Sequence, residues 1–454
     1  MTVVHLSNPK ARHCVILKSN GNNLKNDRQP IAVMWFRRDL RIGDNTALYA
    51  ALNSGLPVLP LFIFDPSILK ALPADDARVN YIYDNVKKLH LHVRGKGGSL
   101  LCKHGIVKDI FDELLRSYRV KDVYVNKDYE PDAILRDEEL ADLLAKRGTG
   151  FHACKDQVIF EEDEVIKQDG LPYTVFTPYK NKWLETFKKN GIPDMDMPPE
   201  RYYPCDMAFP EKNALGIKQS DIRVKAYTLE HLDRYEKERD IPAKDAGSYL
   251  GPHLRFGTVS IREIISGLRP RHDMFLSELI WREFFMQILF HYPRAVHSNF
   301  RKKYDGIIWR NNEKDFIAWC RGETGYPLVD AGMRQLNASA YMHNRVRMIA
   351  ASFLCKHLLI DWRWGERYFA EKLLDFELSS NNGNWQWAAG TGCDAAPYFR
   401  VFNPLTQQEK FDKDLTYIRT WIPDYQEDRY IAKIIDHKTA RERTLTAYKK
   451  ALRV

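Results

Sequence analysis

Cysteine is scarce in this chain, and its few residues are widely separated. Seven cysteines occur in 454 residues, and no two of them form a Cys-x-x-Cys pair. Disulfide frameworks and zinc sites both depend on characteristic, closely spaced ligands. The sequence therefore predicts reduced thiols and no metal site.

Long apolar runs are also missing. No stretch approaches the roughly 20 apolar residues that span a bilayer, and the longest apolar run in the first 30 residues covers only 14–17. The core of a signal peptide is longer than this. We expect no membrane association, a cytoplasmic location and a flexible extension over residues 1–30.

The chain has a moderate basic excess and many aromatic residues. Lys and Arg number 69 against 60 Asp and Glu, a formal net charge of +9. This excess fits nucleic-acid binding, although many unrelated soluble proteins share it. Ten Trp, 23 Tyr and 22 Phe in a basic chain favour a flat cofactor or nucleic-acid bases as ligands.

The first domain is predicted to be α/β and to cover residues 31–155. Apolar runs predict buried strands at 31–36, 58–65 and 123–126, and amphipathic stretches predict helices at 46–53 and 107–118. Strands that alternate with helices form a parallel sheet with both faces covered. We expect a Rossmann-like sheet.

A proline-rich segment separates this domain from a second one. Residues 156–225 are predicted to be a linker, because five prolines between 190 and 225 interrupt any helix there. From 226 to 454 the pattern is almost entirely helical, and we predict helices at 276–290, 332–336 continuing into 341–357, 366–374 and 437–452.

The run at 381–387 combines four amides, a glycine and two tryptophans. By propensity it is a poor helix former. Indoles and amides together suit a flat cofactor with polar edges, since rings stack on it and amides pair with its edge. The basic run at 341–348 points to a negatively charged partner nearby.

Two pairs of charged or aromatic residues are candidates for chemistry. Glu278 and Trp281 are three residues apart, so a helix would place them on one face. Apolar neighbours would desolvate Glu278 and raise its pKa, whereas the ordinary alternative is a surface acid beside a core indole. Arg347 and Asp375 are candidates for a buried ion pair, which is compatible with a purely structural role.

Three further tryptophans could form a chain for electron transfer. Trp385, Trp362 and Trp309 lie in the helical region, and such a chain requires rings in near contact from the cofactor to the surface. Core packing is the usual role of a single tryptophan, and spacing in the sequence does not decide between these roles.

These segments closely resemble the photolyase/cryptochrome flavoprotein family. The resemblance covers residues 31 to about 451 and rests on motifs at 35–41, 281–284, 325–331, 342–348, 361–363, 381–387 and 394–404, in that order. It implies an α/β antenna domain, a linker and a helical domain that holds U-shaped FAD.

Three positions make the chain similar to class I cyclobutane pyrimidine dimer (CPD) photolyases. An acid stands three residues before the Trp-Arg-Glu-Phe motif, as Glu278 does here, where (6-4) photolyases usually have Gln. Asn344 and Met348 match the dimer enzymes in a segment where (6-4) photolyases carry a catalytic His. Asn381 matches the amide that faces flavin N5, where plant cryptochromes have Asp.

The resemblance also implies roles for individual residues. Trp281, Trp387, Asn344, Met348 and Glu278 would contact the flipped dimer in DNA, and Glu278 would stabilise its radical anion. The remaining assignments are Arg345 and Arg400 for DNA phosphates; Tyr235, Ser248, Leu250, Arg282, Arg347, Asp375, Glu377 and Asn381 for FAD; and Trp385, Trp362 and Trp309 for photoreduction.

The sequence departs from the family pattern at two places. The usual Thr-Ser-Arg-Leu-Ser phosphate loop is replaced at 247–251 by a stretch with fewer hydroxyls, so backbone N–H groups would bind the phosphates. Ala133 stands where folate-binding members have Glu. Both the presence and the identity of a second antenna chromophore are therefore open: a deazaflavin, a flavin, a folate or none.

The resemblance implies light-dependent repair of CPDs by electron transfer from excited FADH⁻, carried out by a monomer. The alternatives are a (6-4) photolyase, a cryptochrome-type photoreceptor and a flavin electron carrier. Glu278 and Met348 disfavour the first, Asn381 disfavours the second, and the dimer-contacting residues have no purpose in the third.

Overall fold

Five apolar runs form a parallel sheet near the start of the chain. The computed structural model describes residues 29–453, and its strands are β1 (Ile31–Phe36), β2 (Val58–Phe64), β3 (Leu101–His104), β4 (Val120–Asn126) and β5 (Gly150–Cys154). The order is β3-β2-β1-β4-β5, with all neighbours parallel. The three predicted strands are confirmed. The sequence analysis missed β3 and β5, which lie at the edges of the sheet and are partly exposed.

Helices cover both faces of this sheet. One face carries α1 (Thr46–Asn53) and α3 (Ala77–Gly95), and the other carries α4 (Val107–Ser117) and α5 (Pro131–Ala145). The short α2 (Pro66–Leu69) follows β2. Every residue of β1 and β2 is buried, because a covered parallel sheet presents both of its faces to the core. The α/β prediction is confirmed, and residues 1–28 of the expected extension lie outside the described part.

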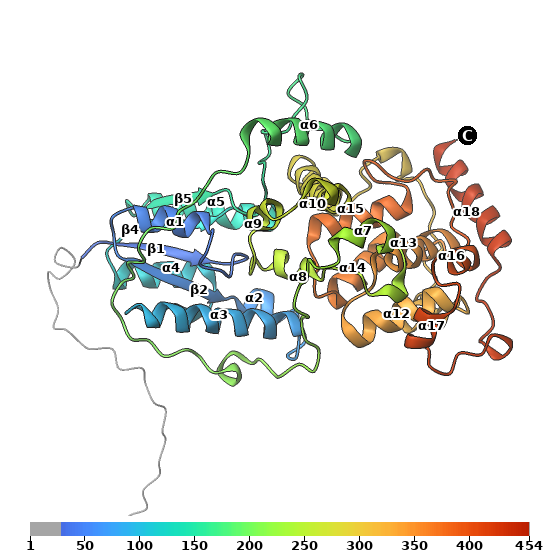
Figure 1. Ribbon diagram of the computed structural model, residues 1–454, viewed down its shortest axis with the longest axis horizontal. Coiled ribbons are helices and arrows are strands. Elements are labelled where there is room, and N and C mark those ends of the chain that lie inside the picture. The colour runs from blue at the N-terminus through green and yellow to red at the C-terminus, as the bar shows by residue number, and fades with distance from the viewer. Residues whose placement is uncertain (1–28, 454) are drawn as a thin grey trace, which may run out of the picture.

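Helices form most of the remaining chain, as predicted (Figure 1). Their bounds are α6 (Phe176–Asn190), α7 (Leu232–Glu238), α8 (Leu250–Arg255), α9 (Ile261–Ser266), α10 (Asp273–His291), α11 (Glu313–Arg321), α12 (Pro327–Ser339), α13 (Asn344–Ser352), α14 (Trp362–Lys372), α15 (Leu378–Ala389), α16 (Pro404–Phe411), α17 (Thr416–Trp421) and α18 (His437–Leu452). Within residues 29–453, no helix is both long enough and apolar enough to cross a membrane.

The helix predicted to run through 341–357 is interrupted at both ends. Ala340 has a positive φ of 54°, and α13 begins only at Asn344, where the His343 side chain accepts a hydrogen bond from the backbone N–H of Arg345. Beyond Ser352 the chain continues as a π-helical turn, Phe353–His357. The apolar spacing of the sequence continues through these breaks and therefore does not reveal them.

The predicted linker contains a helix that belongs to the second unit. Figure 1 shows α6 lying across the helical unit beside α10, and the two helices are in contact. The buried carboxylate of Glu283 on α10 accepts hydrogen bonds from Trp183 Nε1 at 2.6 Å and Tyr179 Oη at 3.4 Å, both on α6. It also accepts from the backbone N–H of Ile159 at 2.7 Å. Burial raises the pKa of Glu283 to about 7.

Charged side chains join the α/β unit to the helical unit. Arg38, just after β1, forms ion pairs with Asp128 and Glu130 at 3.0 and 2.8 Å. Arg255 of α8 reaches the same Glu130 at 2.9 Å. A single carboxylate therefore fixes α8 against the sheet, and α8 forms one wall of the cavity described below.

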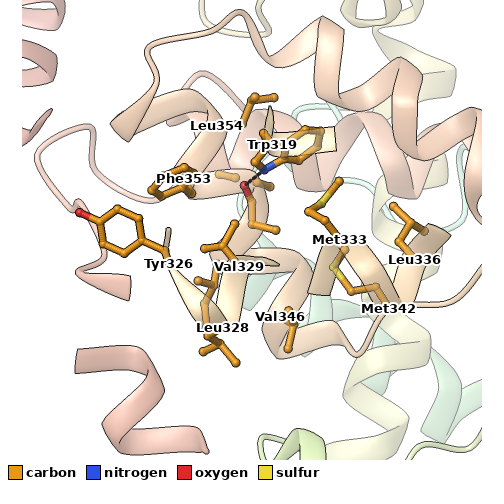
Figure 2. Close-up of a cluster of buried hydrophobic side chains, with 14 of the residues drawn as sticks. Trp319, Tyr326, Leu328, Val329, Met333, Leu336, Met342, Val346, Phe353 and Leu354 are labelled. Atoms are coloured by element: carbon orange, nitrogen blue, oxygen red, sulfur yellow. Dashed lines mark hydrogen bonds between the residues drawn. The ribbon is translucent and has the colours of Figure 1, made fainter. Parts of the chain in front are cut away.

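The core of the helical unit is rich in large aromatic side chains (Figure 2). Trp319 of α11 is fully buried, and its indole N–H donates to the carbonyl of Ala350 at 3.1 Å. The same cluster contains Trp362 of α14 and Trp385 of α15. This core holds α13, α14 and α15 in place around the cavity.

Candidate active site

The amide-and-indole run forms part of helix α15, so the expectation of a poor helix is wrong. Glu377 caps the helix, and its carboxylate accepts from the backbone N–H groups of Ser379 and Ser380. The amides of Asn382 and Gln386 both donate to the carbonyl of Ala295 at 3.0 Å. These tertiary hydrogen bonds outweigh the weak intrinsic propensity.

Glycines allow α15 to pack closely against its neighbours. A Cβ atom on Gly383 would lie 2.2 Å from the ring of Phe285 on α10, and one on Gly365 of α14 would lie 2.1 Å from the indole of Trp385. Any larger side chain would push these helices apart. α15 is thus held at a fixed distance from both walls of the cavity.

A cavity of about 220 Å³ opens between α8, α10, α13, α14 and α15. Nine of the predicted site residues line it: Arg282, Asn344, Arg347, Met348, Asp375, Glu377, Asn381 and Trp387, predicted to bind cofactor or lesion, and Trp385, predicted for electron transfer. Gly251, Arg255, Phe369 and Asn384 are among the other lining residues. The fold therefore brings residues as far apart in the sequence as Gly251 and Trp387 into one space.

One wall of the cavity presents an amide of defined orientation. The Asn381 Nδ2 group donates to the backbone carbonyl of Glu366 at 3.0 Å and to its carboxylate at 2.8 Å. Both N–H bonds are therefore used, and the carbonyl oxygen is the atom available to a ligand. Such an oxygen can accept a hydrogen bond from an N–H at the edge of a flat ring.

The predicted ion pair between Arg347 and Asp375 is confirmed. Two hydrogen bonds join them, at 3.1 and 2.9 Å, and Arg347 Nε also donates to the carbonyl of Met342 at 2.7 Å. Burial acts to lower the pKa of Arg347, but Asp375 outweighs it and raises that pKa above its ordinary value. The guanidinium therefore stays charged beside the cavity.

The solvent end of the cavity carries the predicted lesion residues of α13 and α15. Asn344 is exposed at the start of α13, while Met348 and Trp387 are half-buried. An amide, a thioether and an indole provide a polar edge and two apolar surfaces, which suits a flat heterocycle.

Glu278 and Trp281 share helix α10, as predicted, but their surroundings differ from the expectation. The Glu278 side chain is 31% exposed and forms an ion pair with Arg239 at 2.6 Å. The expected apolar, desolvated environment is therefore absent, because Arg239 supplies a charge there. The sequence did not reveal this partner, since Arg239 lies 39 positions away from Glu278. The indole of Trp281 is stacked on Phe176 of α6.

The predicted phosphate-binding residues occupy two different places. Arg282 lines the cavity and donates to the carbonyl of Gln157 at 2.8 Å, and burial lowers its pKa. Ser248 and Leu250 flank Tyr249, whose φ of 53° turns the chain into α8. Tyr235 lies on α7 with its ring edge-on to Phe275, outside the residues that line the cavity.

The two arginines expected to bind DNA differ in availability. Arg400 is exposed, with its guanidinium over the ring of Phe402 at 5.5 Å. Arg345 is paired with Asp240 at 2.7 Å and lies over Phe411 at 4.6 Å. A phosphate would therefore meet Arg400 directly but would have to compete with Asp240 for Arg345.

The three tryptophans of the expected electron chain lie in or against one core. Trp362 and Trp385 are fully buried in it, and Trp309 packs against it from a half-buried position. The Trp362 indole donates to Asn299 Oδ1 at 2.9 Å. Trp385 also contacts Trp319 edge to face, with ring centroids 6.1 Å apart. The sequence does not predict this contact, because the position of a single Trp in the sequence does not indicate which rings lie next to it in the fold.

The donor set of the cavity fits a flavin and not a metal. It offers one oriented carbonyl oxygen, a charged guanidinium, a second arginine and apolar ring surfaces. Within residues 29–453, no group of His, Cys, Asp or Glu could hold a metal ion, and the six described cysteines are free. A parallel α/β unit joined to a helical unit with such a cavity defines a flavoprotein.

Comparison with known proteins identifies the family. Residues 32–200 match the family model described as DNA photolyase, and residues 275–429 match the one described as FAD binding domain of DNA photolyase. A deoxyribodipyrimidine photo-lyase of Agrobacterium fabrum is 37% identical, over 92% of this chain and 97% of its own length. The chain belongs to the DNA photolyase family.

Solved structures agree with this assignment. A bacterial class III photolyase from Agrobacterium tumefaciens matches with a TM-score of 0.81 and 34% identity, over 96% of this chain and all of its own. An archaeal photolyase from Sulfolobus tokodaii, solved with two FAD molecules, also has a TM-score of 0.81 and 34% identity, over 92% of this chain and 99% of its own.

Proposed function

We propose that this protein is a deoxyribodipyrimidine photo-lyase that repairs cyclobutane pyrimidine dimers in DNA under light. One observation carries the proposal: residues suited to a flavin edge and residues suited to a flipped base line the same cavity of about 220 Å³. Electron transfer to a lesion requires donor and acceptor to be close, and a shared cavity meets that requirement.

The inner residues hold and orient the cofactor. Asn381 would offer its carbonyl oxygen to an N–H at the edge of a bound flavin, and the charged Arg347 would stabilise negative charge on the ring system. Arg282 provides a guanidinium for the pyrophosphate. When bound, reduced and photoexcited FAD would lend one electron to the dimer and take it back after the two bonds of the cyclobutane ring have broken, so that no net redox change occurs.

The outer residues receive the lesion. Trp387 and Met348 provide apolar contact, Asn344 pairs with base edges, and Trp281 forms part of the platform on α10. Unstacking a base pair costs a few kcal/mol, and less for a damaged one. A dimer is therefore admitted more readily than undamaged bases.

Glu278 is assigned to the dimer carbonyls, to which the O–H of a carboxylic acid would donate. Its ion pair with Arg239 would have to open for this, because an ionised carboxylate only accepts hydrogen bonds. Arg239 can also offset the negative charge that the dimer gains with the electron, as preorganised charges do. Arg239 is therefore part of the proposed site, although no sequence signal indicated it.

DNA backbone binding is assigned to Arg400 and to the overall basic charge. Arg400 is exposed on the loop after α15, and the chain carries a net charge of +9. Phosphate contacts of this type weaken as salt concentration rises. We assign Arg345 a weaker contact, since Asp240 already holds it.

A second, antenna chromophore is proposed without a fixed identity. The Sulfolobus tokodaii photolyase holds two FAD molecules. Ala133, at the position of the family's folate-binding Glu, is buried on α5, which disfavours a folate and leaves a flavin or a deazaflavin. Extraction of the purified protein and separation of its chromophores decides between them by absorption spectrum.

Repair of defined lesions tests the proposal. The reduced protein is irradiated with oligonucleotides that carry either one CPD or one (6-4) product, and reversal is assayed for each. We expect reversal of the CPD alone. Reversal of the (6-4) product alone, or of neither lesion, would refute the proposal.

A further inference from the structure

Helix α6 supplies a ring that lies directly against the indole of Trp281. The rings of Phe176 and Trp281 are stacked with their centroids 3.6 Å apart and an interplanar angle of 9°. Among the described residues, no other pair of rings is as close. Trp281 is half-buried and Phe176 is buried, so the ring of Phe176 occupies one face of the indole.

Other contacts fix the remaining sides of the same indole. Phe284 lies edge-on to it at 5.5 Å, and Phe285 is tilted against it at 5.4 Å. These two residues belong to α10 itself. Phe176 comes from a segment more than 100 residues earlier in the sequence. Of the three rings, it is the one that lies nearly parallel to the indole of Trp281.

The position of Phe176 is itself fixed by contacts in the first half of α6. The first backbone N–H of the helix, that of Phe176, donates to the carboxylate of Asp394 at 3.1 Å. Further along α6, Tyr179 and Trp183 are bound to the buried Glu283, which lies two residues after Trp281. Asp394 lies in the same loop between α15 and α16 as the exposed Arg400. α6 therefore connects the indole with the loop assigned to DNA.

We propose that Phe176 is a positioning residue for the lesion, because it sets the plane of Trp281 and leaves the indole only its opposite side for a flipped dimer. The inference rests on the proposed function, since it assigns Trp281 to the lesion. It makes α6, which the sequence suggested was linker, a part of the substrate site.

The physical expectation is a loss of lesion affinity without a loss of chemistry. A stacked aromatic pair contributes about 0.5–1.5 kcal/mol beyond its area burial. If Phe176→Leu frees the indole to rotate, the dissociation constant for CPD DNA should rise by about 2-fold to 10-fold. Phe176 is not among the residues lining the cavity, so FAD content should stay unchanged.

The test compares variants of the full-length holoprotein. Binding of a CPD oligonucleotide and of its undamaged counterpart is measured, together with repair in bound complexes under a single saturating light exposure. Phe176→Leu and Phe176→Met should weaken binding of CPD DNA only and leave repair per bound complex unchanged. Phe176→Tyr, which keeps the ring, should restore the affinity.

A matched control exists on the same helix. Phe187 lies 11 residues further along α6 and is stacked on Trp183 at 4.9 Å and 15° in the same apolar cluster, whereas the ring contacts of Trp281 come from Phe176, Phe284 and Phe285. Phe187→Leu should lower the melting temperature like Phe176→Leu but keep wild-type affinity for CPD DNA. Equal loss of affinity in both variants, or wild-type affinity in Phe176→Leu and Phe176→Met, would overturn the inference.

These outcomes are separable from failure of the proposed function. If the wild-type protein repairs neither lesion, the proposed function fails, whatever the variants do. If the wild-type protein repairs CPDs and Phe176→Leu binds them equally well, only the role of Phe176 fails.

Discussion

At the scale of single residues, the hydrogen-bond partner of each polar side chain determines which of its atoms remain available to a ligand. Asn381 was identified from the sequence, but the use of both its N–H bonds by Glu366 is what leaves an oxygen for the cofactor. The apolar neighbours of Glu278 predict a desolvated carboxylate, but the structure shows a partly exposed one in an ion pair with Arg239. Neither partner could be predicted, because each lies 15 or more positions away without a recognisable motif.

Glu278→Ala should lower CPD repair about 10- to 100-fold under saturating light, since hydrogen bonds to charged groups contribute about 1.5–3 kcal/mol. FAD content should be retained, because Glu278 is not among the residues lining the cavity. Glu185→Ala, which removes a surface ion pair on α6, is the control and should repair normally. Unchanged repair in Glu278→Ala would reject its role.

Trp385→Phe should block light-driven reduction of oxidised FAD but leave chemically pre-reduced protein active in repair. Trp385 lines the cavity and leads into the core that contains Trp362, so it is the first ring available to donate an electron. The absorption change on illumination and the repair assay are measured on one preparation. Loss of both activities with FAD still bound would contradict this assignment.

At the scale of elements, α15 shows where local pattern and tertiary structure disagree. Its amides and glycine predict poor helicity, yet it forms a helix that carries Asn381, Trp385 and Trp387. The stabilising partners are the cap at its start and the hydrogen bonds to Ala295. α6 is the opposite case, since its sequence suits a helix but the prolines after it suggested a linker.

Glu377→Ala should destabilise the protein by about 0.5–2 kcal/mol, the usual cost of losing a helix N-cap. The carboxylate of Glu377 accepts hydrogen bonds from the N–H groups of Ser379 and Ser380 in the first turn of α15, so FAD should also dissociate faster from the loosened cavity. Urea unfolding and the FAD off-rate are the measurements. Glu377→Asp should recover part of the stability and part of the slow FAD dissociation. A wild-type stability and a wild-type FAD off-rate in Glu377→Ala would show that the cap is dispensable.

The π-helical turn Phe353–His357 makes stability depend on pH. Burial lowers the pKa of His357 to about 3, and His437 adds to this effect. The folded state therefore holds the imidazole neutral, while the unfolded chain protonates below about 6.5. This contribution to stability is complete above pH 6.5 and is lost as pH falls toward 3.

The free energy of unfolding should therefore fall between pH 6.5 and 4, and His357→Gln should flatten this slope. Lys356 affects stability at higher pH, because burial lowers its pKa to about 7. Its contribution to the free energy of unfolding therefore rises as the pH increases above 7. The exposed His104 provides the control, and His104→Gln should keep the wild-type slope. An unchanged slope in His357→Gln would contradict the assignment.

At the scale of the whole molecule, the sequence predicted the α/β and helical units and about half of the residues that line the cavity. Periodic apolar runs gave the parallel sheet and the helices, since these signals are local. Nine of the predicted residues meet in one cavity. The contacts between segments, such as Phe176 on Trp281 and Arg255 on Glu130, could not be predicted, because they arise only when α6 and α8 are packed.

The central claim is that reduced FAD and a flipped dimer occupy one cavity, close enough for direct electron transfer. The most direct measurement is the excited-state lifetime of the reduced cofactor with and without bound CPD DNA. The lifetime should shorten strongly with CPD DNA and stay the same with undamaged DNA of equal sequence. An unchanged lifetime in protein saturated with CPD DNA would contradict the claim.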